Sequence, residues 1–173
     1  MNLLKFNKFC LKIAVVALII IPITATQAAT TTITLTIAGG GLSISAPSSG
    51  TFGTVASPSS ASVELEAVTV TDTRDPHEAT WTATAVITAL THSDGVTTIP
   101  ATLFRYTADT PTKTGSVTLT TTAETAFVSP IAVVSAASIN GNNSATWTPL
   151  ITIPVPAGKP TGTYTGTITH SVS

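Results

Sequence analysis

The sequence has very little cysteine and little charge, with one cysteine in all and only 9% of its residues charged. Because Cys10 lies close to the N-terminus, neither a disulfide framework nor thiol chemistry is expected beyond it. Residues 30–173 contain four basic and eight acidic side chains, which gives a net charge near −4. Nucleic-acid binding requires a basic patch, so this composition excludes it and disfavours acidic lipid surfaces as well.

Residues 1–29 have the three-part pattern of a secretory signal peptide. Three lysines precede an apolar run at residues 13–23, and small residues offer a cleavage site after Ala28 or Ala29. The apolar run is shorter than the ~20 residues that a membrane-spanning helix needs. We therefore predict a cleaved signal peptide (residues 1–29) and a secreted domain (residues 30–173) that has no membrane segment after cleavage.

The remaining chain is threonine-rich, with 37 threonines in the full sequence. Residues 68–89 (VTVTDTRDPHEATWTATAVITA) contain two alternating runs around a short charged stretch. Trp81, Ala83 and Ala85 share one face of the second run, and this period of two is typical of a half-buried strand. Pro76 cannot donate to a strand ladder, so the charged stretch is expected to be a loop. Composition and period together predict an all-β domain.

Eight or nine strand-like runs follow one another, separated by turn signals, and we see no convincing helix after the signal peptide. One run is residues 31–37 (TTITLTI), whose isoleucines and leucine alternate and are expected to point inward. The spacing predicts a single β-sandwich with Ig-like or jelly-roll-like connections.

Two local patterns make sharper predictions about the strands. The apolar positions change phase near Ala67, which indicates either a β-bulge or a strand that crosses between two sheets. Asn140 and Gly141 both tolerate positive φ, so this pair predicts a type I′ hairpin turn.

The charged loop offers the main candidates for metal chemistry. His77-Glu78 begins a near match to the zinc motif H-E-x-x-H, but Trp81 occupies the second histidine position and no helix is expected. Asp72, Asp75 and Glu78 leave calcium binding open. The favoured alternative is that Asp72 binds loop amides while the other two acids face water. Arg74 lies between the acids and is expected to neutralise part of the cluster by pairing with one carboxylate. We predict no catalytic, cofactor-binding or metal-binding residues.

The aromatic side chains leave two interpretations open. The four side chains of Trp81, Trp147, Tyr106 and Tyr164 could form a platform on which sugar rings stack. Core packing is favoured for each tryptophan, because both lie in alternating strands and buried aromatics dominate sandwich cores.

Two stretches resemble a known family. VTVTDTRDPHEATWTA and the final WTPLITIPVPAGKPTGTYTGTITHSVS are similar to segments of small secreted proteins of actinobacteria and related Gram-positive bacteria, which are related to the WxL cell-surface proteins. The resemblance implies a surface β-sandwich that associates non-covalently with peptidoglycan or with other surface proteins. Its candidate ligand-binding or family-motif residues are Asp72, Arg74, Trp81, Trp147 and Tyr164.

The sequence therefore predicts a secreted, non-enzymatic protein located outside the cell or at the cell wall. The alternative is a pilus- or coat-like subunit that assembles through edge strands. In that alternative, residues 30–38 are the only evident donor strand.

Overall fold

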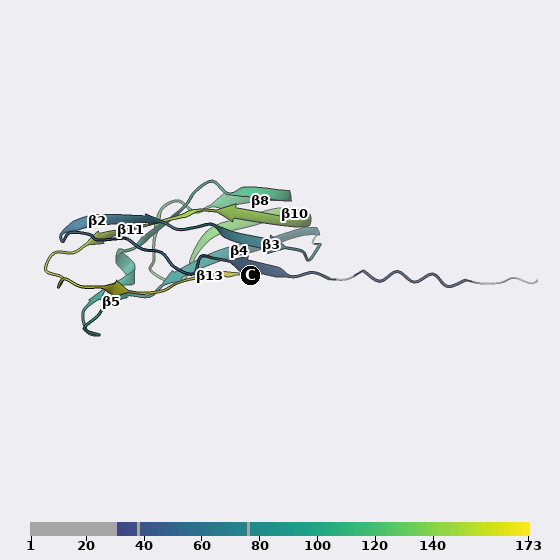
Figure 1. The fold of residues 1–173 in the computed structure, drawn as a ribbon. Helices are drawn as coiled ribbons and strands as arrows, with labels where there is room; N and C mark the ends of the chain where they lie inside the picture. Colours follow the sequence, from purple (N-terminus) through teal and green to yellow (C-terminus); the bar gives the residue numbers. More distant parts are fainter. Residues whose placement is uncertain (1–30, 38, 76) are drawn as a thin grey trace, which may run out of the picture. The chain divides into compact units, whose positions relative to one another are not determined.

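The computed structural model describes residues 31–37, 39–75 and 77–173 (Figure 1). The chain divides into two units, Met1–Thr36 and Ile37–Ser173. The predicted signal peptide lies outside the described residues. Among the residues that are described, no helix is long and apolar enough to cross a membrane.

Residues 31–37 have no regular secondary structure. Ile33, Leu35 and Ile37 are 90%, 83% and 79% exposed. The prediction that these three side chains point into the core is therefore wrong. Among the described residues, no strand pairs with this segment, so its alternating side chains do not face a sheet.

The second unit is nearly all β, which confirms the predicted all-β class. Its described part has thirteen strands, more than the eight or nine expected, and one short 3-10 helix, Ala101–Leu103. Sheet A contains six strands: β1 (Leu42–Ser45), β3 (Val68–Asp72), β4 (His77–Ile87), β8 (Thr112–Thr121), β10 (Ile131–Trp147) and β13 (Ile168–Val172).

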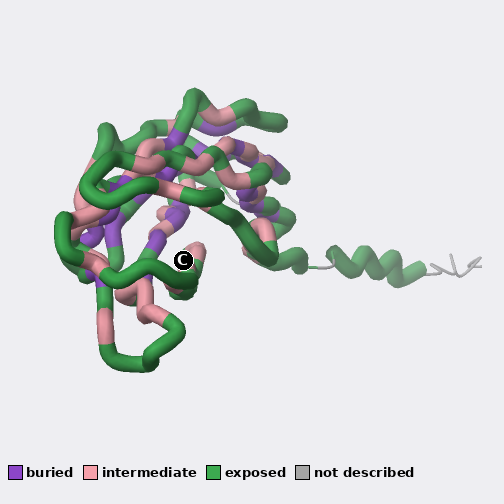
Figure 2. Tube along the Cα trace, turned by 60° about the vertical axis from the view of Figure 1, so that its left-hand side comes forward, coloured by how far each residue is buried: buried purple, intermediate pink, exposed green. Residues whose placement is uncertain are grey.

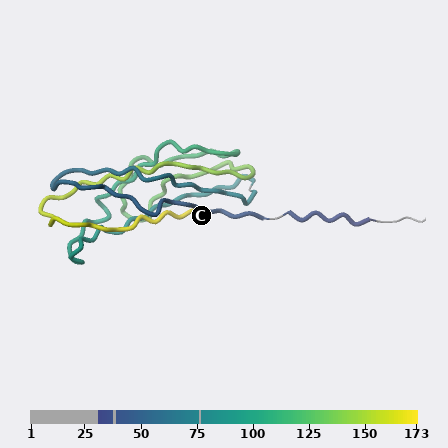
Figure 3. Tube along the Cα trace, viewed as in Figure 1, coloured from purple at the N-terminus to yellow at the C-terminus, as the bar shows by residue number. Residues whose placement is uncertain are grey.

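Sheet A is nearly closed on itself. Its order is β1-β3-β10-β4-β13, and β8 pairs with β10 beside this path. All of these pairings are antiparallel, so β1 and β13 run in the same direction. The Cα atoms of these two strands come within 8 Å of each other, and the C-terminal end lies beside β1 in the trace (Figure 3). No pairing between β1 and β13 is found in the described part of the chain.

Two smaller sheets complete the second unit. Sheet B has the order β2-β11-β7-β9, and sheet C has the order β12-β5-β6. Their strands are β2 (Ser59–Glu64), β11 (Pro149–Val155), β7 (Arg105–Ala108), β9 (Thr125–Ala126), β12 (Tyr164–Thr165), β5 (Leu90–His92) and β6 (Thr98–Ile99).

The core forms where alternating strands face one another. In β4, Trp81, Ala83 and Ala85 are at most 1% exposed, and the residues between them are half-buried, as the period of two predicts. Buried positions follow the central strands in Figure 2, whereas the connecting loops are exposed. Trp147 at the end of β10 is also 1% exposed, so both tryptophans belong to the core.

The phase change near Ala67 marks a crossing between sheets. β2 ends at Glu64 in sheet B, and β3 begins at Val68 in sheet A. Since β2 and β3 belong to different sheets, the inward positions are odd-numbered in β2 and even-numbered in β3. Of the two alternatives, the crossing is confirmed and the bulge is wrong.

The predicted hairpin at Asn140-Gly141 is also wrong. Both residues lie inside β10, and Gly141 has a φ of 76°. The register of β10 against β4 shifts between Ala136 and Asn140. β10 then leaves β4 and pairs with β3 from Asn143 to Trp147. The positive φ of Gly141 therefore belongs to an irregularity within β10, at the point where its pairing partner changes from β4 to β3. It does not reverse the direction of the chain.

Candidate functional site

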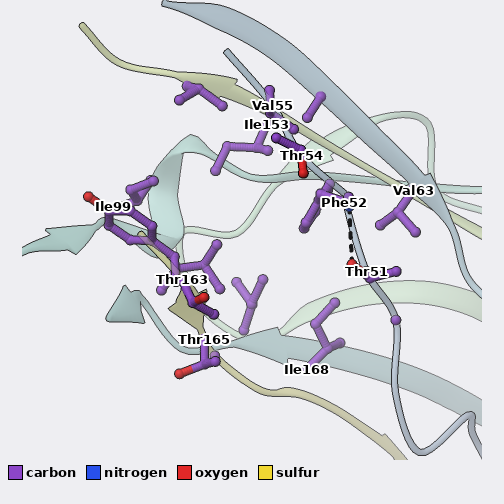
Figure 4. A pocket seen from close by; sticks show the side chains of 18 of the residues that line it. Thr51, Phe52, Thr54, Val55, Val63, Ile99, Ile153, Thr163, Thr165 and Ile168 are labelled. Atoms are coloured by element: carbon purple, nitrogen blue, oxygen red, sulfur yellow. Dashed lines mark hydrogen bonds between the residues drawn. The ribbon is translucent and has the colours of Figure 1, made fainter. Parts of the chain in front are cut away.

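A groove of about 980 Å³ lies within the second unit, between the β2 and β11 side and the β12 and β13 side (Figure 4). The loop of residues 47–57 also lines it, with Phe52 and Val55 only half-buried. Apolar side chains reach the groove from all of these elements, and they include Phe52, Val63, Ile153 and Ile168.

The groove exists because edge strands cover their own side of the core incompletely. In β2, Ala61 and Val63 point inward and are half-buried. In β13, Ile168 and Val172 behave in the same way, whereas the inward positions of the central strand β4 are fully buried. The apolar layer is thus open along these edges.

One edge of β13 has free backbone groups. Thr82 and Ser173 exchange both backbone hydrogen bonds (2.8 and 3.2 Å), and the Thr88 N–H donates to the Thr167 carbonyl (2.9 Å). Because such pairs alternate along an antiparallel ladder, every second residue of β13 directs its N–H and C=O away from β4. Among the described residues, β4 is the only strand that pairs with β13. The residues with outward backbone groups are Ile168, His170 and Val172.

The long edge strand β8 is protected by comparison. It pairs with β10 and has no second partner in the described part of the chain. The Lys113 Nζ donates a hydrogen bond to the backbone carbonyl of Val117 in the same strand. Lysine on an edge discourages the approach of another strand. No Lys, Arg, Asp or Glu occurs in β13.

Asp72 and Arg74 form an ion pair at the end of β3. The Asp72 side chain has no exposed area, and its two oxygens accept from Nε and Nη2 of Arg74, both at 2.9 Å. Asp72 also accepts the Arg74 backbone N–H (3.1 Å). Hydrogen bonds from the Arg74 side chain lower the pKa of Asp72, against the opposing effect of burial. The favoured alternative for this loop, a carboxylate bound to loop amides, is confirmed.

The other two acids of the loop lie apart from this pair. Asp75 and Glu78 are exposed. Within the described ranges, no group of three His, Cys, Asp or Glu side chains is placed to hold a metal ion. The calcium alternative therefore gains no support from the loop's geometry.

Each tryptophan is held by one hydrogen bond to a partner far away in sequence. The Trp81 Nε1 donates to the Asn143 Oδ1 (3.2 Å), and a hydrogen bond from the Asn143 side chain also contributes to the lowered pKa of Asp72. The Trp147 Nε1 donates to the Tyr106 hydroxyl (2.9 Å). Neither indole has an exposed face on which a sugar ring could stack.

A short polar chain links Trp147 to the groove. The Tyr106 oxygen accepts from the Trp147 Nε1 and lies 3.2 Å from His170 Nε2. When the neutral imidazole carries its proton on Nδ1, the Tyr106 hydroxyl donates to Nε2. Burial lowers the pKa of His170, which agrees with a neutral ring.

Tyr164 is the one candidate aromatic that lines the groove. It is half-buried, its ring centroid lies 4.8 Å from that of His92, and its hydroxyl donates to the Pro160 carbonyl (3.0 Å). Three of the five predicted site residues are therefore buried, namely Asp72, Trp81 and Trp147. Arg74 is partly exposed and paired with Asp72, and Tyr164 lines the groove. The free edge of β13 was missed, because strand order cannot be read from the sequence.

The fold defines a nearly all-β domain with a partly open core. No protein-family model, no curated protein and no solved structure matches this chain. Its function must therefore be inferred from its own geometry.

Proposed function

We propose that this chain is a secreted, non-enzymatic structural protein of the bacterial cell surface that assembles with further copies by strand addition. A single β-sandwich surface domain is the structural unit of the proposal. The observation that carries it is the exposed segment of residues 31–37, which has the alternation of a strand but pairs with no strand in the part of the chain that the structure describes.

Exposure of this segment is energetically unfavourable. Burying a Leu or Ile side chain contributes about 1.5–3 kcal/mol relative to leaving it in water, and three such side chains are 79–90% exposed here. They occur at every second residue, so an extended backbone places all three on one face. The intervening threonines tolerate solvent on the other face. A sheet edge on another molecule would satisfy both the side chains and the backbone.

The test is the state of association of residues 30–173, measured by light scattering and sedimentation velocity. We expect assemblies that grow with concentration, and a monomeric Ile33→Thr/Leu35→Thr/Ile37→Thr variant, called the donor variant below. Val96→Thr is the matched control, because Val96 is 82% exposed in a loop elsewhere. A wild-type chain that stays monomeric at all concentrations would contradict the proposal.

Association with the cell-wall polymer is the second candidate. It is supported by the groove, whose lining includes Tyr164. The same lining includes the hydroxyl-bearing side chains of Thr163 and Thr165, which Figure 4 labels. An aromatic ring beside hydroxyls suits a sugar chain. We expect the protein to co-sediment with purified Gram-positive peptidoglycan and Tyr164→Ala to weaken this. Val96→Thr is again the control, and equal pelleting of Tyr164→Ala and wild type would exclude the groove as the binding site.

A further inference from the structure

We infer that the acceptor for residues 31–37 is the free edge of β13, together with the groove beside it, on a second copy of this chain. The inference rests on the proposed function and specifies the partner and the contact. The contact has two halves, and neither is paired with another strand of the described residues. One is the apolar, strand-like segment, and the other is a sheet edge whose apolar side is incompletely covered.

The two surfaces match in period. Alternate residues of a strand lie about 7 Å apart, so Ile33, Leu35 and Ile37 span about 13 Å on one face. β13 presents free backbone groups at Ile168, His170 and Val172, which have the same two-residue spacing. A strand added in register would pair its backbone at these positions and direct its apolar side chains towards the groove.

The two surfaces also match in charge. Residues 31–37 contain no charged side chain. Among the described residues that line the groove, Lys159 is the only one with a formal charge, because His170 is neutral. Its Nζ already donates to the Thr98 carbonyl (2.7 Å). Nothing in the groove therefore opposes an apolar strand.

The other long edge is a weaker acceptor. β8 carries Lys113, whose Nζ occupies the Val117 carbonyl. A strand that added to β8 would have to displace this ammonium and lie beside its charge. In β13 the outward backbone groups have no such protection, so β13 is the preferred edge.

The position of β1 sets a structural requirement. Hydrogen-bonded strands lie about 4.8 Å apart, so a strand between β1 and β13 needs about 9.6 Å. Since their Cα atoms approach within 8 Å, β1 must move outward by at least about 1.6 Å at its nearest point. β1 has only four residues, so the segment that has to move is short.

The experiment mixes two variants of residues 30–173 that lack opposite halves of the contact. The donor variant keeps the acceptor edge. Ile168→Asp keeps the donor segment but places a charge in the groove, and we expect its self-association to be at least about tenfold weaker than that of wild type. Each variant alone is expected to be monomeric. A mixture should form a 1:1 heterodimer and nothing longer, because one donor and one acceptor remain.

Thr169→Asp is the matched control, since its exposed side chain points away from the groove on the same strand. It should assemble like wild type. Circular dichroism and urea unfolding check folding, and Val172→Asp replaces Ile168→Asp if the latter is unfolded.

The outcomes separate this inference from the proposed function. If the donor variant is monomeric but both acceptor variants assemble like wild type, assembly is real and the acceptor lies elsewhere. If wild type does not assemble, both ideas fail. A mixture that stays monomeric although wild type assembles also overturns the β13 assignment.

Discussion

The buried carboxylate of Asp72 depends on one partially exposed arginine. Asp72 has no exposed side-chain area, whereas the Arg74 side chain is 37% exposed. Removing Arg74 would leave a buried charge with fewer donors, and such a group is costly. Solvent access at Arg74 reduces that cost.

We predict that Arg74→Ala lowers the free energy of unfolding at pH 7 by about 2 kcal/mol. The lowered pKa of Asp72 stabilises the fold above the ordinary value of 3.8, and this contribution is lost as the pH falls through the folded-state pKa. The difference between variant and wild type should therefore shrink below pH 4. Urea unfolding followed by circular dichroism measures both effects.

Arg105→Ala is the matched control for that experiment. Arg105 pairs with Glu124 at 3.4 Å, and both side chains are about half exposed. An exposed pair contributes about 0–1 kcal/mol, so this variant should differ little from wild type. An equal effect of the two substitutions would contradict a special role for the Asp72 pair.

His170 is predicted to make stability depend on pH near neutrality. Its pKa is lowered from 6.5 by burial, so the fold is fully stabilised above pH 6.5 and loses stability as the pH falls towards the folded-state value. His170→Gln keeps an acceptor for Tyr106 and does not titrate. Urea midpoints from pH 8 to 5 should fall less steeply for this variant, and parallel slopes would contradict the prediction.

The sequence predicted that Arg74 would pair with one carboxylate of the charged loop, because it lies among those acids, and the structure shows that the partner is Asp72. It did not predict that Asn143 would hold Trp81 or that Tyr106 would hold Trp147. These partners are 62 and 41 residues apart, and only the sheet order brings them together.

At the scale of elements, β10 shows how a strand can contain turn-like residues. Positive φ at Gly141 suited a hairpin, but 17 residues continue as one strand because β4, β3 and β8 all pair with it. Period and phase predicted most strands. Period and phase did not predict that residues 31–37 would remain outside every sheet, because this segment has the same apolar alternation as the strands that are buried.

Gly115 and Gly141 both have a positive φ, but a side chain would clash with neighbouring atoms only at Gly115. Substitution of the two glycines therefore distinguishes the cost of backbone strain from the cost of a steric clash. Gly115 has a φ of 75°, and a Cβ there would lie 2.3 Å from the Asn142 carbonyl oxygen. At Gly141 the nearest atom is the Asp75 Oδ1 at 3.6 Å, which is ordinary contact.

We predict that Gly141→Ala costs about 1 kcal/mol from strain and that Gly115→Ala costs clearly more, because β8 must also move from β10. Urea unfolding of both variants provides the comparison. Equal losses of stability would show that β8 is loosely held.

At the scale of the whole molecule, the chain has little charge and its proposed contact surface has almost none. An association built on apolar burial and backbone hydrogen bonds should not respond to ionic screening. We predict that the association constant of wild type changes little when sodium chloride is raised. Sulfate should strengthen association, because it favours burial of apolar surface. Sedimentation velocity in each salt tests this, and a steep loss with sodium chloride would indicate an ionic contact instead.

The asymmetry between the exposed segment and the free edge has a further consequence for growth. Contact between two different surfaces is heterologous, and it generates an open filament unless the rotation between neighbours closes a ring. Such a filament is polar: one tip shows an unused strand and the other an unused edge. A molecule that has only the donor segment or only the acceptor edge would bind at one tip and stop growth there, while the opposite tip could still grow. Filament length would therefore depend on the ratio of complete to incomplete subunits.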